Sequence, residues 1–439
     1  MHNKIYKNNR EQFAIVNSIK TQRSCRNMSL STQFNTFSSN LIESPNTKKG
    51  KCGVFGISEN LSNTLKPGLG LRKFSLGSFT LKFNENLRTS PTVLIHEKVQ
   101  AIEKLPLTAE KASKVFAKNL SSYETIEIHT FREIFYVGAC KKPEINNFDD
   151  QSKNLLVFEN DHIAYRYQIK RVLGIGSFSQ VYEAYDWKKR MNIAIKIIRN
   201  KEKYKKQSAK EIGFLKFIKE KSTNLPFAEM LTSFEFRDHI CIVFKIIGPP
   251  IGNQVCESLE MQKYTIDILV CLQFLHSHKI VHCDLKPSNI LLSNKKVAHL
   301  IDLGTATHVN EQVYKYVQSR NYRAPEVILR VKYNEKIDMW SLGCLLFEIA
   351  KGKLLFEGNN EAELLLQVCR KIGEPPKGWK KTCEKVWNEA RPVIGNELVD
   401  DLVNLNPTIR EVILGCVQWN PKLRISSSEA LNLFKKNAW

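Results

Sequence analysis

The chain has 439 residues, 42% of them hydrophobic, and a formal net charge of +22. This length allows one large two-lobed domain with extensions, or two to three smaller domains. Its eleven cysteines include no Cys-x-x-Cys pair, so neither a zinc site nor a disulfide framework is indicated. No apolar run approaches the roughly 20 residues that span a bilayer, and no signal peptide is recognisable, so we expect a cytoplasmic or nuclear protein without integral membrane association. The positive charge is compatible with nucleic-acid contact, but no basic patch with interleaved aromatic residues supports such a site.

Residues 1–100 are rich in Asn, Ser, Thr and Lys and carry 15 Lys and Arg against 5 Glu. This composition buries too little apolar surface to offset the entropy of ordering, and it predicts a disordered basic extension. Residues 101–158 have a different sequence pattern and are predicted to form an accessory segment and a linker. Thr108 is positioned as a helix N-cap, although Lys111 stands where a capping box would have Glu. From Tyr123 the alternation suggests a strand or an irregular docking segment.

Three short strands are predicted next, over 167–173, 180–186 and 192–198, and a helix follows over 203–221. The first two strands enclose a glycine-rich loop, whose backbone amides can approach a polyphosphate closely. A lone Gly-x-Gly is usually an ordinary turn, but here a lysine follows in the third strand, which is typical of protein kinases. The predicted helix holds one glutamate that could order this lysine, although a surface position is the alternative. The candidate nucleotide-binding residues are Leu173, Gly174, Ile175, Gly176, Ser177, Phe178, Ser179, Gln180, Val181, Ala194, Lys196 and Glu211.

The stretch 280–292 places Asp284, Lys286 and Asn289 between two apolar runs. Phosphoryl transfer needs a carboxylate to orient the attacking hydroxyl, a cation near the phosphoryl group and an amide ligand for Mg²⁺. A charged surface loop between buried strands is the simpler alternative, but this order of Asp, Lys and Asn is the catalytic-loop pattern of protein kinases. Asp302 follows eighteen residues after Asp284, at the end of an apolar strand, and is placed to chelate Mg²⁺ together with Asn289.

Further elements follow in the same order. The stretch from Ser319 to Glu326 ends an activation-type segment, and an apolar helix is predicted from Ile337 to a stop at Gly352. Residues 167–439 as a whole resemble a eukaryotic protein kinase domain of the group that contains cyclin-dependent and MAP kinases. The resemblance implies an α+β bilobal fold, with a small β-rich N-terminal lobe and a larger helical C-terminal lobe.

Within that group the sequence is most similar to the dual-specificity tyrosine-regulated kinase (DYRK) family, class 2. Cys283 stands where most kinases have Arg, and Tyr314 and Tyr316 match the Tyr-x-Tyr activation loop of the family. Residues 159–166 resemble the DYRK homology box, and 107–142 resemble the accessory segment of class 2.

The resemblance implies a monomeric kinase that uses ATP and Mg²⁺ and modifies Ser and Thr of protein substrates. Asp284 would orient the substrate hydroxyl as catalytic base, and Lys286 would steady the γ-phosphoryl group. Lys196 and Glu211 would hold the ATP phosphates. By family analogy Tyr316 is phosphorylated by the chain itself, and Arg320 and Arg323 are predicted to bind the phosphate because Cys283 replaces the usual arginine. An unmodified buried tyrosine is the alternative at this position.

Several positions depart from the family pattern. Leu303 replaces the usual Phe of Asp-Phe-Gly, Ser179 stands at the third glycine of the loop, and Lys245 replaces an acidic hinge residue. The link between Gly248 and Glu257 is also shorter than in relatives. A pseudokinase scaffold is therefore the second hypothesis, and a nucleic-acid-binding protein, which rests on charge alone, is a distant third. The presence of all four chemical groups, on Lys196, Asp284, Asn289 and Asp302, favours an active enzyme.

Overall fold

The described part of the chain belongs to one unit. The computed structural model describes residues 105–139, 148–222, 224–252, 256–311, 316–382 and 395–436, which all lie in the second of two units, residues 82–439. The predicted basic extension 1–100 and Tyr314 lie outside the described residues. Within the described ranges, no helix is both long enough and apolar enough to cross a membrane.

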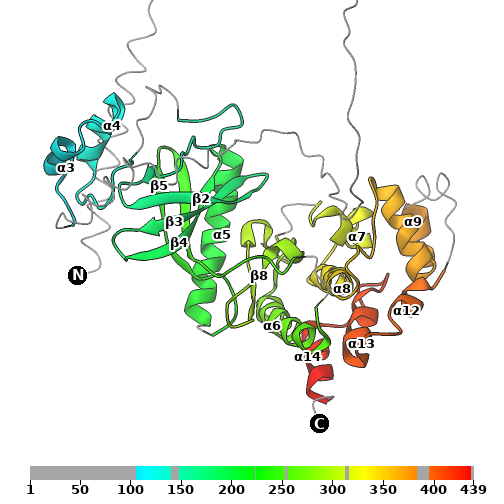
Figure 1. Cartoon of the computed structure of the whole chain (residues 1–439). Helices are drawn as coiled ribbons and strands as arrows, with labels where there is room; N and C mark the ends of the chain where they lie inside the picture. The colour runs from blue at the N-terminus through cyan, green and yellow to red at the C-terminus, as the bar shows by residue number, and fades with distance from the viewer. Residues whose placement is uncertain are drawn as a thin grey trace, which may run out of the picture. The chain divides into compact units, whose positions relative to one another are not determined.

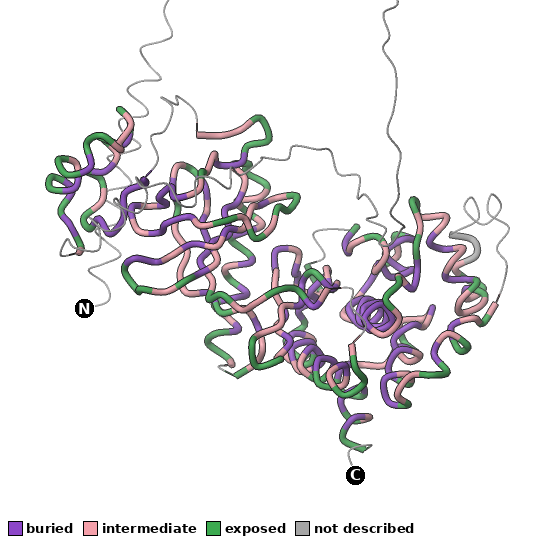
Figure 2. The backbone as a smooth tube through the Cα atoms, in the orientation of Figure 1, coloured by how far each residue is buried: buried purple, intermediate pink, exposed green. Residues whose placement is uncertain are grey.

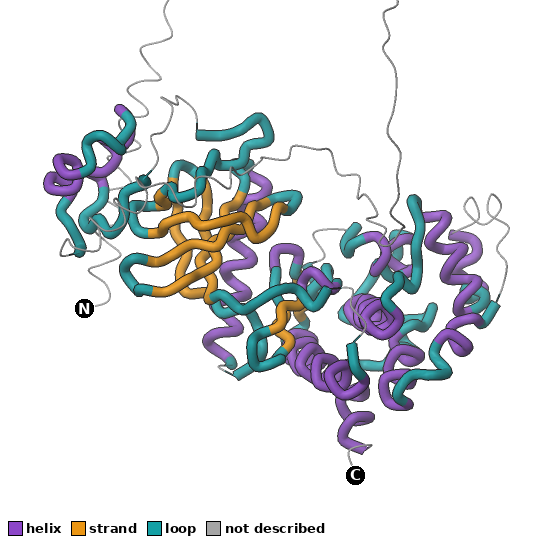
Figure 3. Tube along the Cα trace, viewed as in Figure 1, coloured by secondary structure: helices purple, strands orange, loops and turns teal. Residues whose placement is uncertain are grey.

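Six antiparallel strands form the sheet of the N-terminal lobe, in the order β1-β2-β3-β4-β6-β5 (Figure 1; Figure 3). The three strands predicted from the sequence are confirmed, each extended by one or two residues. Along β4 the side chains of Ile193, Ile195 and Ile197 point to one face because successive strand residues alternate, and all three are buried. The strands are β1 (His162–Ile163), β2 (Tyr167–Ile175), β3 (Ser179–Asp186), β4 (Met191–Ile198), β5 (Met230–Phe236) and β6 (His239–Lys245).

Helix α5 (Glu202–Lys221) contacts β4, β5 and β6 and begins one residue before its predicted start. Its buried residues include Glu211, Phe214, Leu215 and Ile218, which follow the three- and four-residue spacing of one helix face. Glu211 therefore lies on the apolar face of the helix. A carboxylate in such a position needs a partner, because an unpaired buried charge is strongly unfavourable.

The C-terminal lobe is helical and has α8 (Lys336–Lys351) at its centre. Almost every side chain of α8 is buried, and Figure 2 shows it as a nearly continuous buried element. The predicted stop at Gly352 is confirmed, since this residue adopts the left-handed conformation (φ 67°) that favours glycine after a helix. Two of the other helices, α6 (Ser258–Ser277) and α13 (Pro407–Cys416), contact α8. The remaining helices of this lobe are α7 (Pro325–Ile328), α9 (Glu361–Ile372), α10 (Lys377–Thr382), α12 (Glu397–Asp401) and α14 (Ser427–Lys436). The α+β bilobal fold expected from the sequence is thus confirmed.

The accessory segment contains two short helices and an extended stretch. In α3 (Ala109–Val115) the predicted N-cap is confirmed, because the Thr108 hydroxyl accepts a hydrogen bond from the Lys111 amide at 3.3 Å. The strand alternative from Tyr123 is wrong for the first residues, which form α4 (Ser122–Glu127). The physical reason is a complete capping box between Ser121 and Glu124, which satisfies two amide groups at the helix start.

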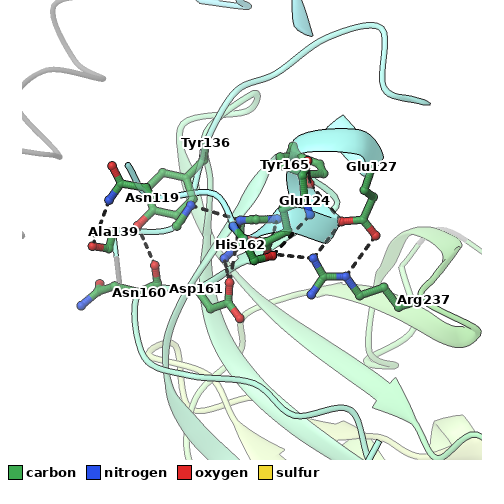
Figure 4. Close-up of polar contacts among 12 residues, drawn as sticks. Asn119, Glu124, Glu127, Tyr136, Ala139, Asn160, Asp161, His162, Tyr165 and Arg237 are labelled. Carbon is green, nitrogen blue, oxygen red and sulfur yellow. Dashed lines mark hydrogen bonds and ion pairs between the residues drawn. The ribbon is translucent and has the colours of Figure 1, made fainter. Parts of the chain in front are cut away.

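A buried ionic network joins this accessory segment to the sheet (Figure 4). Arg237, in the turn between β5 and β6, donates to Glu124 at 2.8 Å and to both carboxylate oxygens of Glu127 at 3.0 and 2.8 Å. The hydroxyl of Tyr165 donates to Glu127 at 2.9 Å, and the Gly138 amide donates to His162 Nδ1 at 3.1 Å. The box 159–166 therefore contributes β1 to the sheet and also contacts the accessory segment.

Candidate active site

Lys196 of β4 lies at the centre of the first cluster of predicted site residues. Its ammonium group bonds Glu211 at 2.7 and 3.0 Å and Asp302 at 2.8 Å, so the structure brings these three residues together. Burial alone would lower the pKa of Lys196, but the neighbouring carboxylates of Asp302 and Glu211 raise it. The ammonium group therefore stays charged, as a ligand for phosphates must.

The predicted catalytic loop is held by Asp338, the third residue of α8. One carboxylate oxygen of Asp338 accepts from the His282 amide at 2.8 Å, and the other accepts from the Cys283 amide at 3.0 Å. Cys283 has a positive φ of 67°, which the buried carboxylate stabilises by accepting both amides. The sequence analysis gave Asp338 no role, although an acidic residue between apolar neighbours in a largely apolar helix was a usable signal.

Asp284 lies beside Lys286 and Asn289, as predicted. Its carboxylate bonds the Lys286 ammonium at 2.8 Å, and its backbone carbonyl accepts from the Asn289 amide nitrogen at 2.8 Å. Ser319, which the sequence analysis did not select, completes the arrangement: its hydroxyl donates to Asp284 at 2.7 Å and accepts from Lys286 at 3.0 Å. A hydroxyl group is thus held between the proposed base and the proposed cation.

The pairing of two short strands brings the residue before Asp302 beside Asn289. In the sheet of β8 (Ile290–Leu292) and β9 (Ala298–Leu300), Ile290 pairs with Leu300, and the Ile301 amide donates to the Asn289 carbonyl at 3.0 Å. Burial raises the pKa of Asp302, but the Lys196 ammonium outweighs it and holds this pKa below its ordinary value. An ionised carboxylate beside a neutral amide supplies the oxygen ligands that Mg²⁺ prefers, so the residues present fit this ion.

The glycine-rich loop joins β2 to β3 and reaches this cluster through Phe178. The Phe178 ring centroid lies 5.0 Å from the Lys196 ammonium, and a side chain at Gly304 would meet this ring at 3.1 Å. A Cβ at Gly174 would meet nothing within 4 Å, so packing leaves that position open to a ligand. Ser179, at the third glycine of the family pattern, is the first residue of β3 and pairs with Ile198.

The loop's remaining residues divide between solvent and sheet. Leu173 and Ile175 are exposed at the end of β2, and Gly176 donates its amide to the Ser179 carbonyl at 2.8 Å. Gln180 and Val181 belong to β3, where Val181 pairs with Lys196, and Ala194 pairs with Phe244 of β6. Ser177 lies in the loop itself, between the two strands.

Two departures from the family pattern are mild in the structure. Leu303 is buried, as the replaced Phe would be, and the carbonyl of the next residue, Gly304, accepts from Gln207 of α5 at 2.6 Å. Lys245 is exposed at the end of β6 and lies 4.0 Å from Glu229. Neither substitution removes a group from the clusters around Lys196 and Asp284.

Tyr316 contacts Arg323, near the end of the activation-type segment. The Arg323 guanidinium stacks 3.8 Å from the Tyr316 ring centroid and also donates to its hydroxyl. Arg323 is fixed in turn by the carbonyls of Val317 at 2.9 Å and Gln318 at 2.7 Å. At the base of the segment Glu326 and Arg424 form a buried bidentate ion pair, at 2.5 and 2.7 Å.

Comparisons with known proteins agree with this geometry. The family model described as the protein kinase domain matches residues 167–434. The chain is 35% identical over 378 residues to dual specificity tyrosine-phosphorylation-regulated kinase 4 of Homo sapiens, which covers 78% of this chain and 72% of that protein. It is 37% identical over 291 residues to dual specificity tyrosine-phosphorylation-regulated kinase 3 of Rattus norvegicus, and the match covers 62% of this chain and 50% of that protein. A putative homolog of the same kinase 3 from Drosophila melanogaster is 30% identical over 458 residues, and the match covers 91% of this chain and 54% of that protein.

The chain therefore belongs to the protein kinase family, whose members transfer phosphoryl groups from ATP to proteins. Within it, the relatives place the chain among the dual specificity tyrosine-phosphorylation-regulated kinases, class 2, as the sequence resemblance predicted. The chain spans about half the length of the rat and fly relatives.

Proposed function

We propose that the chain is an active dual-specificity kinase that phosphorylates Ser and Thr of protein substrates and its own Tyr316. The observation that carries this proposal is the Ser319 hydroxyl, held 2.7 Å from Asp284 and 3.0 Å from Lys286. A base must lie within hydrogen-bond reach of the proton it accepts, and the contact between Ser319 and Asp284 supports the proposal that Asp284 receives a serine-type hydroxyl.

The residues around this point have separate tasks. Asp284 orients the attacking hydroxyl, and Lys286 neutralises charge on the γ-phosphoryl group as it transfers. Lys196, ordered by Glu211, binds the phosphates of ATP, and Asp302 with Asn289 would hold Mg²⁺. When bound, Mg²⁺ neutralises the charge that develops between the phosphates.

The second candidate is a pseudokinase scaffold, and Lys245 with the short link after Gly248 favours it. These residues border the region that would receive the nucleotide base and the substrate, so they would explain a low kinase activity. A cytoplasmic or nuclear monomer acting on proteins stays our prediction for the setting of the enzyme.

The test is phosphoamino-acid analysis of a generic basic protein after incubation with radiolabelled ATP, together with mass spectrometry of the chain. We expect labelled serine and threonine in the substrate and phosphate on Tyr316 of the chain. The Asp284→Asn variant, which keeps the size of the side chain but not its basicity, should give neither. Equal labelling by the wild type and this variant would remove the enzymatic proposal, and a wild-type chain without phosphate on Tyr316 would remove the autophosphorylation.

A further inference from the structure

Tyr316 lies in a cationic site that has more arginines than the sequence analysis expected. Besides Arg323, the guanidinium of Arg330 lies 5.9 Å from the Tyr316 ring centroid, and Arg320 acts electrostatically on the Tyr316 hydroxyl. Among the described residues, none of these three arginines forms an ion pair within 4.0 Å, and Glu361 acts on Arg323 only electrostatically. The site therefore has a surplus of positive charge.

The one acidic residue acting on this hydroxyl is Glu361, the first residue of α9, as far as the described residues show. Burial and then the neighbouring Glu361 carboxylate raise the pKa of Tyr316, so the hydroxyl keeps its proton at neutral pH. Three arginines and one glutamate leave two positive charges, and a phosphotyrosine carries about −1.5 to −2 at pH 7. A phosphate on Tyr316 would thus balance the site.

The backbone at Arg330 also points to a specific role. Arg330 follows Leu329, the C-cap of α7, and has a φ of 56°, in the left-handed region where glycine is favoured after a helix. An arginine here is held in a less favourable backbone conformation than glycine would be. This conformation places its guanidinium beside Tyr316.

We propose that Arg330 is a third phosphate ligand of phosphorylated Tyr316, beside Arg320 and Arg323. The proposal rests on the phosphorylation of Tyr316 proposed above. A phosphate dianion on this hydroxyl is attracted by the three guanidinium groups and repelled by the Glu361 carboxylate. Phosphorylation therefore adds charge-assisted bonds to Arg320, Arg323 and Arg330.

The rate at which a tyrosine phosphatase removes the phosphate measures how firmly it is bound. The substrate is the folded full chain with phosphotyrosine installed at position 316 during translation, so the test does not depend on autophosphorylation. Arg330→Gly suits the local backbone and should leave the fold intact, while Lys332→Ala changes a nearby exposed cation as a matched control. Glu361→Gln keeps a hydrogen-bond acceptor but removes the repelling charge.

We expect dephosphorylation about tenfold faster in Arg330→Gly, unchanged in Lys332→Ala and several-fold slower in Glu361→Gln, from the loss or gain of one charge-assisted contact. A wild-type rate in Arg330→Gly would overturn the role of Arg330, and a wild-type rate in Glu361→Gln would overturn the repulsion between the phosphate and Glu361. If the ordinary chain lacks phosphate on Tyr316, the proposed autophosphorylation fails, while the rates of the installed phosphotyrosine still decide this inference.

Discussion

Replacing Arg237 with alanine should detach the accessory segment from the sheet of the N-terminal lobe. Arg237 is the only cation that an ion pair joins to Glu124 and Glu127 among the described lysines and arginines, and its side chain is 3% exposed (Figure 4). Its removal leaves two carboxylates, 0% and 10% exposed, without their guanidinium partner. Because solvent hardly reaches this pair, screening by water does not reduce the loss.

The magnitude follows from the geometry. Breaking a buried ion pair by removing one partner costs about 3–5 kcal/mol, and here three charge-assisted bonds of 2.8 to 3.0 Å are lost together. Lys188 and Glu133 offer a matched control, since their ion pair of 2.8 Å joins the same two parts of the chain but is about half exposed. Lys188→Ala should cost at most about 1 kcal/mol.

Hydrogen exchange over residues 122–137, combined with thermal unfolding, separates these two cases. Arg237→Ala should lose protection in this range and Lys188→Ala should not. Adding Glu127→Gln to Arg237→Ala should restore part of the loss, because one unpaired buried carboxylate is neutralised. Equal protection in the Arg237→Ala and Lys188→Ala variants would refute the conclusion that the buried network anchors the segment.

Two further results are expected from single substitutions. Gly248→Ala should destabilise the chain by about 1–3 kcal/mol, because the added Cβ would lie 2.1 Å from the Leu292 carbonyl oxygen. Gly213→Ala in α5 should instead stabilise the chain by up to about 1 kcal/mol, because its added Cβ would meet nothing within 4 Å and alanine favours the helix. Chemical denaturation measures both, and a tolerated Gly248→Ala would contradict the close approach. Burial lowers the pKa of His299, so the unfolded chain takes up the proton first and stability should fall as pH drops below about 6.5. His299→Gln should reduce the pH dependence of the free energy of unfolding between pH 7 and 5. An unchanged pH dependence would mean that other groups cause it.

The site was largely predictable because its motifs are local in the sequence. Asp284, Lys286 and Asn289 lie within six residues, and the pairing of Lys196 with Glu211 followed from a strand and a helix of clear periodicity. Ser319 was missed because a serine in a polar segment has no periodic signal, and only the fold brings it to Asp284.

The anchoring of the accessory segment could not be predicted in the same way. Arg237 follows Glu127 by 110 positions and lies in a turn, where charged residues are usually solvated. The helix α4 is a different case, since the Ser121 and Glu124 capping box was visible in the sequence. Alternating apolar residues were given more weight there, although the helix cap decided the local structure.

The central claim is that Asp284, held beside Lys286 and Ser319, serves as the base of a protein kinase. The most direct measurement is the initial rate of phosphoryl transfer from ATP to a protein substrate, for the wild type and for Asp284→Asn purified in the same way. General-base catalysis contributes about 10²–10⁴-fold, so we expect the variant to be slower by at least about a hundredfold while it binds ATP as well as the wild type. Equal rates in the two proteins would contradict the account.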